Sequence, residues 1–180
     1  MRGDQETLTI KGLHVSFYCA GCGAEDEGSH VRAAARMLAD EIFRPTNRLD
    51  DPWSRSRLLG EFRERLDLAR EGRLIPREEC RPVGDGTFPL YEIRWQEVVV
   101  KEALPSSPRG HQSRTLLARL IHAEPDLPPY SMVTLHPHQK IITGDKRETR
   151  DLQDEEIRIA GAKYDDGRAS TWGVVVRHEV

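Results

Sequence analysis

The sequence of 180 residues contains few cysteines and no long apolar run. Three cysteines are too few for a disulfide framework, so we expect a reducing, cytoplasmic location. No segment approaches the roughly 18 consecutive apolar residues that a membrane helix needs, and the N-terminus lacks the apolar stretch of a secretory signal. The expectation is a cytoplasmic protein with no membrane partner.

Several catalytic motifs are also missing. The sequence has no GxGxxG, P-loop, HExxH or GxSxG pattern, which argues against nucleotide-binding, zinc-protease and serine-hydrolase functions. Hydrophobic residues make up 37% of the chain and charged residues 32%, so we expect a modest core under a heavily charged surface. Residues 1–180 fit a single domain.

The cysteines raise the question of a zinc site. Cys19 and Cys22 form one CxxC pair, and His30 and Cys80 are the remaining candidate ligands. A structural zinc site needs four ligands, and no second close pair of cysteines is present. We therefore expect free thiols and no metal or cofactor, with zinc on these four residues as the alternative.

Residues 1–50 are expected to form an N-terminal strand and a helix, joined by a loop rich in cysteine, glycine and acidic residues. Alternating apolar residues predict a strand over Leu8–Tyr18, and Ser29 is a candidate N-cap for a helix over His30–Phe43. Asp51 followed by proline predicts the start of a second helix, which ends near Gly72. These two helices should form an antiparallel pair on one face of a sheet.

Strands are expected to follow the helices. Alternation predicts a strand over residues 90–100, and residues 101–113 have the composition of a loop. Residues Thr115–Ala123 fit a strand or a short helix. A strand from Ser131 should end at Pro137.

After a basic loop, Thr149 or Asp151 is a candidate cap for a short helix that reaches Tyr164, and residues 172–176 fit a last strand. This order predicts an α+β fold with a curved, antiparallel sheet of four to five strands, two helices on one face and a short C-terminal helix.

The segment 131–150 carries most of the candidate chemistry. It contains two imidazoles and four cations, namely His136, His138, Lys140, Lys146, Arg147 and Arg150. Cations can neutralise phosphate oxygens, and histidine can transfer protons near neutral pH. The net charge of −3 argues mildly against nonspecific nucleic-acid binding, but residues 101–150 have eight Lys and Arg against five Asp and Glu. An ordinary polar loop is the alternative.

Five segments resemble the RelE/HigB-like toxin superfamily, in particular its phage-associated HigB-like branch. They are LAREGRLIPREECRPVGDG, PLYEIRW, RLIHAE, MVTLHPHQK and TRDLQDEEIRIAGAKYDD, within about Leu58 to Tyr164. The resemblance implies that residues 51–180 form a RelE-like core. Members of this family are mostly ribonucleases that cut mRNA, often on the ribosome, and are held inactive by an antitoxin protein. The implied partners are therefore RNA, including ribosome-bound mRNA, and a cognate antitoxin.

Position in these segments assigns the candidate residues. The expected catalytic residues are His136, His138, Lys140 and Arg119, and the expected RNA-binding residues are Arg94, Lys146, Arg147, Arg150 and Tyr164. Either imidazole serves as base or acid, and the cations stabilise the phosphate. Other roles remain open: Arg94 fits a salt bridge to Glu92 or Glu124, Tyr164 fits packing under its helix, and His122 fits a structural role.

Two functions are therefore compared. The first is a toxin-type ribonuclease, or mRNA interferase, which the cluster of His, Lys and Arg favours. The second is a catalytically silent binding or regulatory module with the same fold, derived from a phage or mobile element, which the acidic balance favours.

Overall fold

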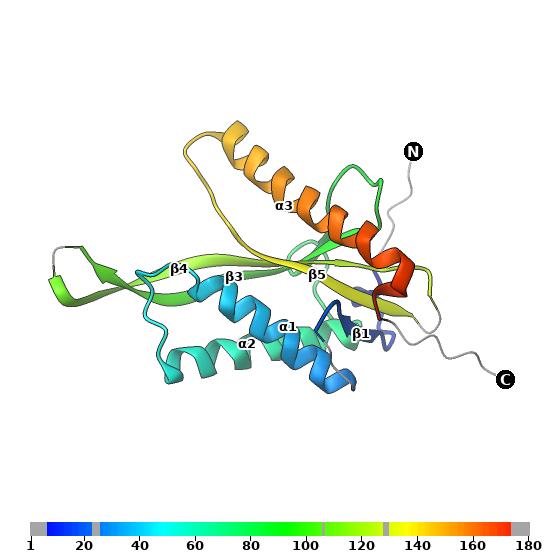
Figure 1. Ribbon diagram of the computed structural model, residues 1–180, viewed down its shortest axis with the longest axis horizontal. Coiled ribbons are helices and arrows are strands. Elements are labelled where there is room, and N and C mark those ends of the chain that lie inside the picture. The colour runs from blue at the N-terminus through cyan, green and yellow to red at the C-terminus, as the bar shows by residue number, and fades with distance from the viewer. Residues whose placement is uncertain (1–6, 23–25, 106, 128–129, 174–180) are drawn as a thin grey trace.

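The computed structural model describes residues 7–22, 26–105, 107–127 and 130–173 (Figure 1). The α-helices are α1 (Glu27–Phe43), α2 (Pro52–Arg70) and α3 (Lys146–Gly167). The strands are β1 (Ser16–Cys19), β2 (Cys80–Pro82), β3 (Leu90–Leu104), β4 (Ser107–Ala123) and β5 (Ser131–Lys140). Two short 3-10 helices, η1 (Leu8–Ile10) and η2 (Arg168–Gly173), complete the order. Within the described residues, no helix is both long and apolar enough to cross a bilayer.

The strands form one mixed sheet in the order β1-β5-β4-β3-β2. Strands β2 to β5 pair with their neighbours in antiparallel fashion, whereas β1 runs parallel to β5, with Ser16 opposite Ser131. The α+β class is confirmed, whereas the predicted antiparallel arrangement holds for β2 to β5 but not for the edge strand β1, so the sheet is mixed. A short hairpin joins antiparallel neighbours, but β1 and β5 are far apart in the chain and no hairpin connects them, so they can pair in parallel.

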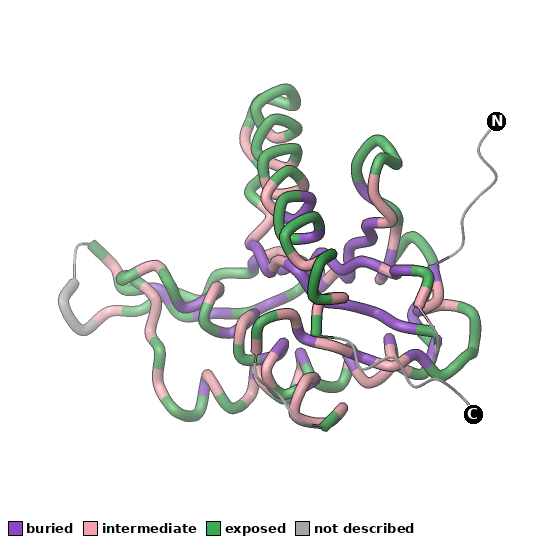
Figure 2. Tube along the Cα trace, turned by 45° about the vertical axis from the view of Figure 1, so that its right-hand side comes forward, coloured by how far each residue is buried: buried purple, intermediate pink, exposed green. Residues whose placement is uncertain are grey.

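Helices α1 and α2 cover one face of the sheet, as predicted, and α3 lies on the opposite face (Figure 1). Alternation along β3 divides the core between them: Ile93 and Trp95 belong to the cluster that includes α1 and α2, and Leu90 belongs to the cluster that includes α3. The C-terminal helix is not short, since it spans 22 residues. Its buried residues, Ala160, Gly161 and Tyr164, lie in its C-terminal half, and its N-terminal half has none (Figure 2).

The helix starts follow from local capping. Asp51 accepts hydrogen bonds from the backbone of Trp53 and Ser54, and Pro52 occupies the first turn of α2, as expected. Helix α1 begins at Glu27, earlier than predicted, because Asp26 is its N-cap and Ser29 is the third residue of a capping box.

Helix α3 also begins earlier than predicted. Asp145 caps it by accepting a hydrogen bond of 2.7 Å from the backbone of Arg147. Lys146, Arg147 and Arg150 therefore lie on the first turns of a helix and not in a loop. Of the predicted last strand, Trp172 lies in η2 and packs on the ring of Tyr164, and residues 174–176 fall outside the described residues.

Two strands are longer than predicted. Lys101 pairs with Ser113 and Glu102 with Gln112, so the expected loop is part of a long β3–β4 hairpin that extends beyond the helices (Figure 1). Strand β5 also continues past Pro137. The pairing with β1 ends at Thr134, which makes β5 an edge strand at Pro137, where a residue without an N–H group is tolerated. The strand predicted from Leu8 is shorter, because only Ser16–Cys19 pairs.

Candidate functional site

Two polar side chains of β5, His136 and His138, face α3. A bulge between the pairs Ile121–His136 and His122–Thr134 makes Leu135 the extra residue of the strand. The even-numbered residues that follow the bulge therefore lie on the α3 side of the sheet. Both imidazoles of the strand share this face, and their rings stack with centroids 5.9 Å apart.

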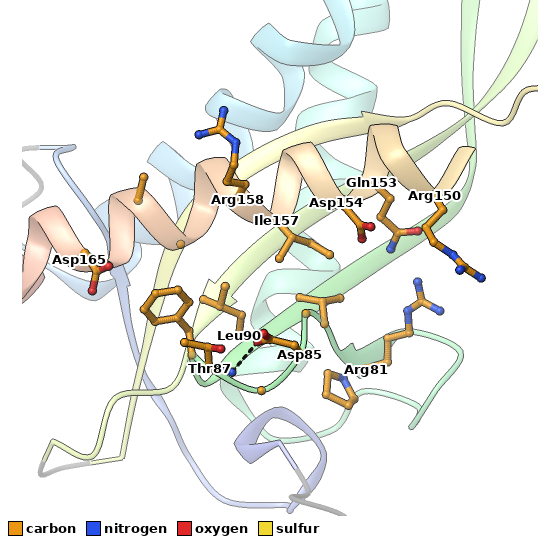
Figure 3. A pocket seen from close by; sticks show the side chains of 17 residues that line it. Arg81, Asp85, Thr87, Leu90, Arg150, Gln153, Asp154, Ile157, Arg158 and Asp165 are labelled. Carbon is orange, nitrogen blue, oxygen red and sulfur yellow. Dashed lines mark hydrogen bonds between the residues drawn. The ribbon is translucent and has the colours of Figure 1, made fainter. Parts of the chain in front are cut away.

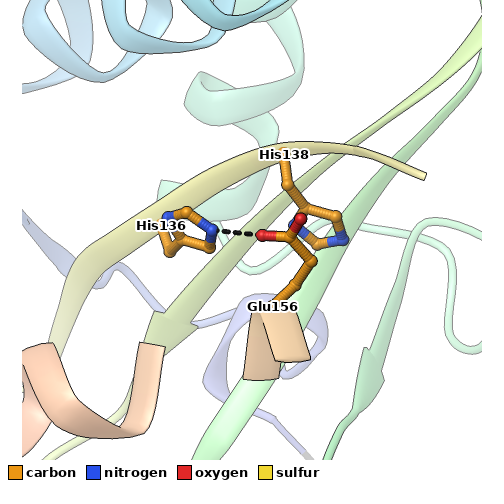
Figure 4. Close-up of side chains that lie close together, drawn as sticks. All are labelled: His136, His138 and Glu156. Carbon is orange, nitrogen blue, oxygen red and sulfur yellow. Dashed lines mark hydrogen bonds and ion pairs between the residues drawn. The ribbon is translucent and has the colours of Figure 1, made fainter. Parts of the chain in front are cut away.

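His136 lies between two side chains of α3. Its Nε2 is 2.5 Å from Oε2 of Glu156 (Figure 4). Its Nδ1 is 3.2 Å from Nζ of Lys163. Lys163 also donates a hydrogen bond of 3.2 Å to the carbonyl oxygen of Leu135. The side chain of His136 is 13% exposed and that of Glu156 is 32% exposed. A small molecule can therefore reach this pair from solvent.

His138 is more deeply placed and is only 3% exposed. Burial, together with the nearby charges of His136, Arg119 and Lys140, lowers the pKa of its imidazole to about 3. Among the described residues, no group forms a hydrogen bond with its Nδ1. A neutral, buried imidazole cannot donate a proton to a substrate at neutral pH, so His138 does not fit the predicted role of general acid.

Glu92 is the centre of a buried charge cluster. Its Oε1 lies 3.1 Å from Nε of Arg81, 3.5 Å from Nε of Arg94 and 3.6 Å from Nε of Arg119. Arg94 also donates a hydrogen bond of 2.7 Å to the carbonyl oxygen of Arg77. The salt bridge between Arg94 and Glu92 that sequence reasoning left open is thus present.

Arg119 is fully buried in this cluster. Its Nη1 donates hydrogen bonds to the carbonyl oxygens of Trp95 at 2.9 Å and Ala118 at 2.7 Å. Burial lowers the pKa of Arg119 to about 10. Because its donors are directed at the backbone and at Glu92, Arg119 does not fit the predicted role of phosphate ligand.

Lys140 is partly exposed, and burial lowers the pKa of its amine. With His138 and Glu156 it lines a recess of about 30 Å³ between β5 and α3. This volume is enough for a water molecule but too small for a phosphate group. Within this recess, a phosphate can therefore contact Lys140 and Glu156 only at the outer rim.

The remaining predicted RNA ligands divide into two groups. Lys146, Arg147 and Arg150 are exposed, and Arg150 lines a groove of about 860 Å³ between residues 82–88 and α3. Arg81 lies at the same end of this groove (Figure 3). Tyr164 is different: it is 6% exposed and packs against Phe88, which fits the alternative of packing under its helix better than contact with RNA.

The four candidate zinc ligands do not come together. Cys19 and Cys22 are joined by a disulfide, so the expectation that this pair forms free thiols is wrong. His30 accepts a hydrogen bond of 3.1 Å from the backbone of Cys19. Cys80 lies in β2, at the opposite edge of the sheet from β1, and is a buried free thiol.

His122 is fully buried on the sheet, with its Nε2 3.2 Å from Glu124, which agrees with a structural role. Sequence reasoning missed Glu156 and Lys163 as neighbours of the histidines. Their spacing of seven residues, with buried Ala160 between them, places them on the same face of α3 and is the signal that identifies them.

Comparison of the chain with protein-family models, curated proteins and solved structures finds no match.

Proposed function

We propose that this protein is a ribonuclease of the toxin type, with a RelE-like arrangement of strands and basic residues, and that it is controlled by an antitoxin protein. The observation that carries the proposal is the pair formed by His136 on β5 and Glu156 on α3, and Glu156 lines the same recess as Lys140. An imidazole, a carboxylate and an amine at one accessible rim supply the groups that RNA cleavage requires.

The proposed reaction uses these three groups. The 2′-oxygen of RNA attacks phosphorus, and the bond from phosphorus to the 5′-oxygen breaks. The pair of Glu156 and His136 accepts the proton from the 2′-hydroxyl and returns it to the leaving 5′-oxygen. Lys140 stabilises the negative charge that builds on the phosphate. This leaves a 2′,3′-cyclic phosphate and a 5′-hydroxyl, and no cofactor takes part.

The exposed cations of α3 fit a role in substrate binding. Lys146, Arg147 and Arg150 lie on consecutive turns and present their charges to solvent. Contacts to phosphates from such side chains add affinity without sequence preference. We assign RNA binding to these three residues, and a structural role to Arg94 and Arg119.

A second function is favoured by one observation. His138 and Arg119 are both buried, and the recess at the candidate site admits only about 30 Å³. A catalytically silent binding or regulatory module would have the same features, since its polar residues serve the fold and not a reaction.

An RNA cleavage assay separates the two functions. Purified protein is incubated with defined RNA, with and without ribosomes, and compared with Glu156→Gln and His136→Gln. Loss of a general acid or base should slow cleavage by about 10²- to 10⁴-fold. The control is His14→Gln, because His14 also pairs with a glutamate, Glu27, but at an exposed position outside the candidate site. A wild-type protein that cuts no RNA in either condition refutes the enzymatic proposal and leaves the binding module.

A further inference from the structure

Three groups that can bind a metal ion meet where α3 crosses β5. One nitrogen each of His136 and His138 and a carboxylate oxygen of Glu156 all lie within 4.8 Å of one another (Figure 4). The two histidines are fixed by the ladder of β5, and the glutamate projects from a helix that is packed on the sheet. The three groups are therefore held close together by regular structure.

The donor atoms of the three side chains favour one class of metal ion. Two imidazoles and one carboxylate suit divalent transition metals, and three protein ligands leave an open coordination position. His138 supports this reading independently, because it is 3% exposed and its Nδ1 forms no hydrogen bond with any described residue. A buried polar atom without a partner is uncommon and calls for a ligand or an ordered water.

We propose that His136, His138 and Glu156 form a binding site for one divalent transition metal ion, with Zn²⁺ as the representative ion. The present contact between Nε2 of His136 and Glu156, at 2.5 Å, opens slightly so that both atoms can contact the ion. Metal binding at these three residues does not depend on the proposed ribonuclease activity.

Lys163 opposes metal binding in a specific way. Its ammonium group lies 3.2 Å from Nδ1 of His136 and donates a hydrogen bond to it. Nε2 of His136 therefore carries the ring proton, which faces Glu156. Metal binding at Nε2 requires the other tautomer, with the proton on Nδ1, and Lys163 then keeps only its hydrogen bond to Leu135. The charges of Lys140 and Arg119, which act on His138, also weaken affinity for a cation.

Lys163→Gln should therefore strengthen the site. The amide oxygen of glutamine can accept the proton of Nδ1 and the positive charge is gone, so both obstacles are removed. Exchange of such an outer partner changes metal affinity by about 10- to 100-fold. A histidine pair whose tautomer does not depend on Lys163 would not gain metal affinity in Lys163→Gln.

Metal binding also has a consequence for RNA cleavage, and this consequence rests on the proposed function. An ion on Nε2 of His136 and on Glu156 occupies the atoms to which proton transfer is assigned. Zn²⁺ should therefore inhibit RNA cleavage, and a chelator should restore it.

The test is a titration of the full chain with Zn²⁺ by calorimetry and with Co²⁺ by visible absorption. We expect one saturable site in the wild type, an affinity at least about tenfold lower in Glu156→Gln and His136→Gln, and a higher affinity in Lys163→Gln. His14→Gln, an exposed histidine beside Glu27, should bind as the wild type does. Circular dichroism checks that each variant is folded, and Glu156→Gln is informative even if a histidine variant unfolds, because its side chain is partly exposed.

The outcomes are distinct. Absence of saturable binding in the wild type, or binding that neither Glu156→Gln nor His136→Gln weakens, overturns the metal site. Saturable binding without RNA cleavage supports the metal site and refutes the proposed function. Cleavage that Zn²⁺ does not affect, in a protein that binds one ion, shows that the reaction uses other residues.

Discussion

The carboxylate of Glu92 on β3 lies 3.6 Å from Nε of Arg119 on β4, and both side chains are shielded from solvent, with exposed fractions of 0% and 1%. The same oxygen also lies within 4 Å of Arg81 and Arg94. One buried carboxylate thus balances three guanidinium groups in the middle of the sheet. Its loss would leave these cations without compensation in a medium that solvates them poorly.

We expect Glu92→Gln to lower the free energy of unfolding by about 3–5 kcal/mol, the usual cost of breaking a buried ion pair from one side. Urea denaturation monitored by circular dichroism measures the change. Glu155→Gln is the matched control, since Glu155 pairs with Arg158 at the surface of α3 and its loss should leave the midpoint unchanged. Equal midpoints for the two variants would show that Glu92 does not hold the cluster together.

Lys140 is the cation that remains available at the candidate site. Lys140→Ala should slow RNA cleavage by about 10²- to 10³-fold, the usual effect of removing one group that stabilises charge in a transition state. Lys140→Arg keeps the charge and should recover part of the rate. Single-turnover kinetics on a short RNA measure both. Lys101→Ala, an exposed lysine on the β3–β4 hairpin, is the control, and a similar loss in that variant would point to general charge and not to Lys140.

Tyr164 tests the distinction between packing and RNA contact. Its ring centroid lies 5.5 Å from Phe88 and 4.7 Å from Trp172, in the core under α3. Tyr164→Ala should cost about 3–5 kcal/mol of stability through the cavity it creates, whereas Tyr164→Phe should cost little. Thermal unfolding measures the stability, and an RNA-binding assay completes the test. Weaker RNA binding by a stable Tyr164→Phe protein would restore the role that sequence reasoning assigned.

Local signals in the sequence were sufficient for the elements that depend on local chemistry. Asp51 and Pro52 predicted the start of α2 because capping involves only neighbouring residues. Alternation over residues 90–100 predicted β3 because each face of that strand packs against a different layer. The composition of residues 101–113 led to the wrong prediction of a loop. The ladder between β3 and β4 extends through this segment although it is rich in proline, serine and glycine.

The site could be predicted only in part, because its geometry depends on non-local pairing. The bulge at Leu135 decides that both imidazoles face α3, and a bulge is defined by the pairing of two strands and not by one strand alone. The contact of His136 with Glu156 depends on how α3 packs across the sheet. Burial of Arg119 likewise follows from Glu92 on the neighbouring strand. A single sequence shows the residue types but not these relationships.

The last prediction concerns the thiols. Cys80 is 1% exposed, and burial raises the pKa of its thiol to about 12. The thiolate is the reactive form, so its fraction stays negligible until the pH approaches that value. At pH 8 and without reductant, the folded protein should therefore not react with iodoacetamide. Unfolding in urea should expose one reactive thiol, and unfolding with reductant should expose all three cysteines.

Mass spectrometry of the alkylated protein counts the modified thiols, and the pH dependence identifies them. In urea the rate of alkylation at Cys80 should rise between pH 7 and 9, because the unfolded thiol returns to its ordinary pKa, whereas the folded protein should remain unreactive over this range. Cys80→Ser should abolish the reaction in urea without reductant. Modification of Cys22, which is partly exposed, in the folded protein would show instead that Cys19 and Cys22 are reduced. The assay thus separates burial of Cys80 from oxidation of the other two cysteines.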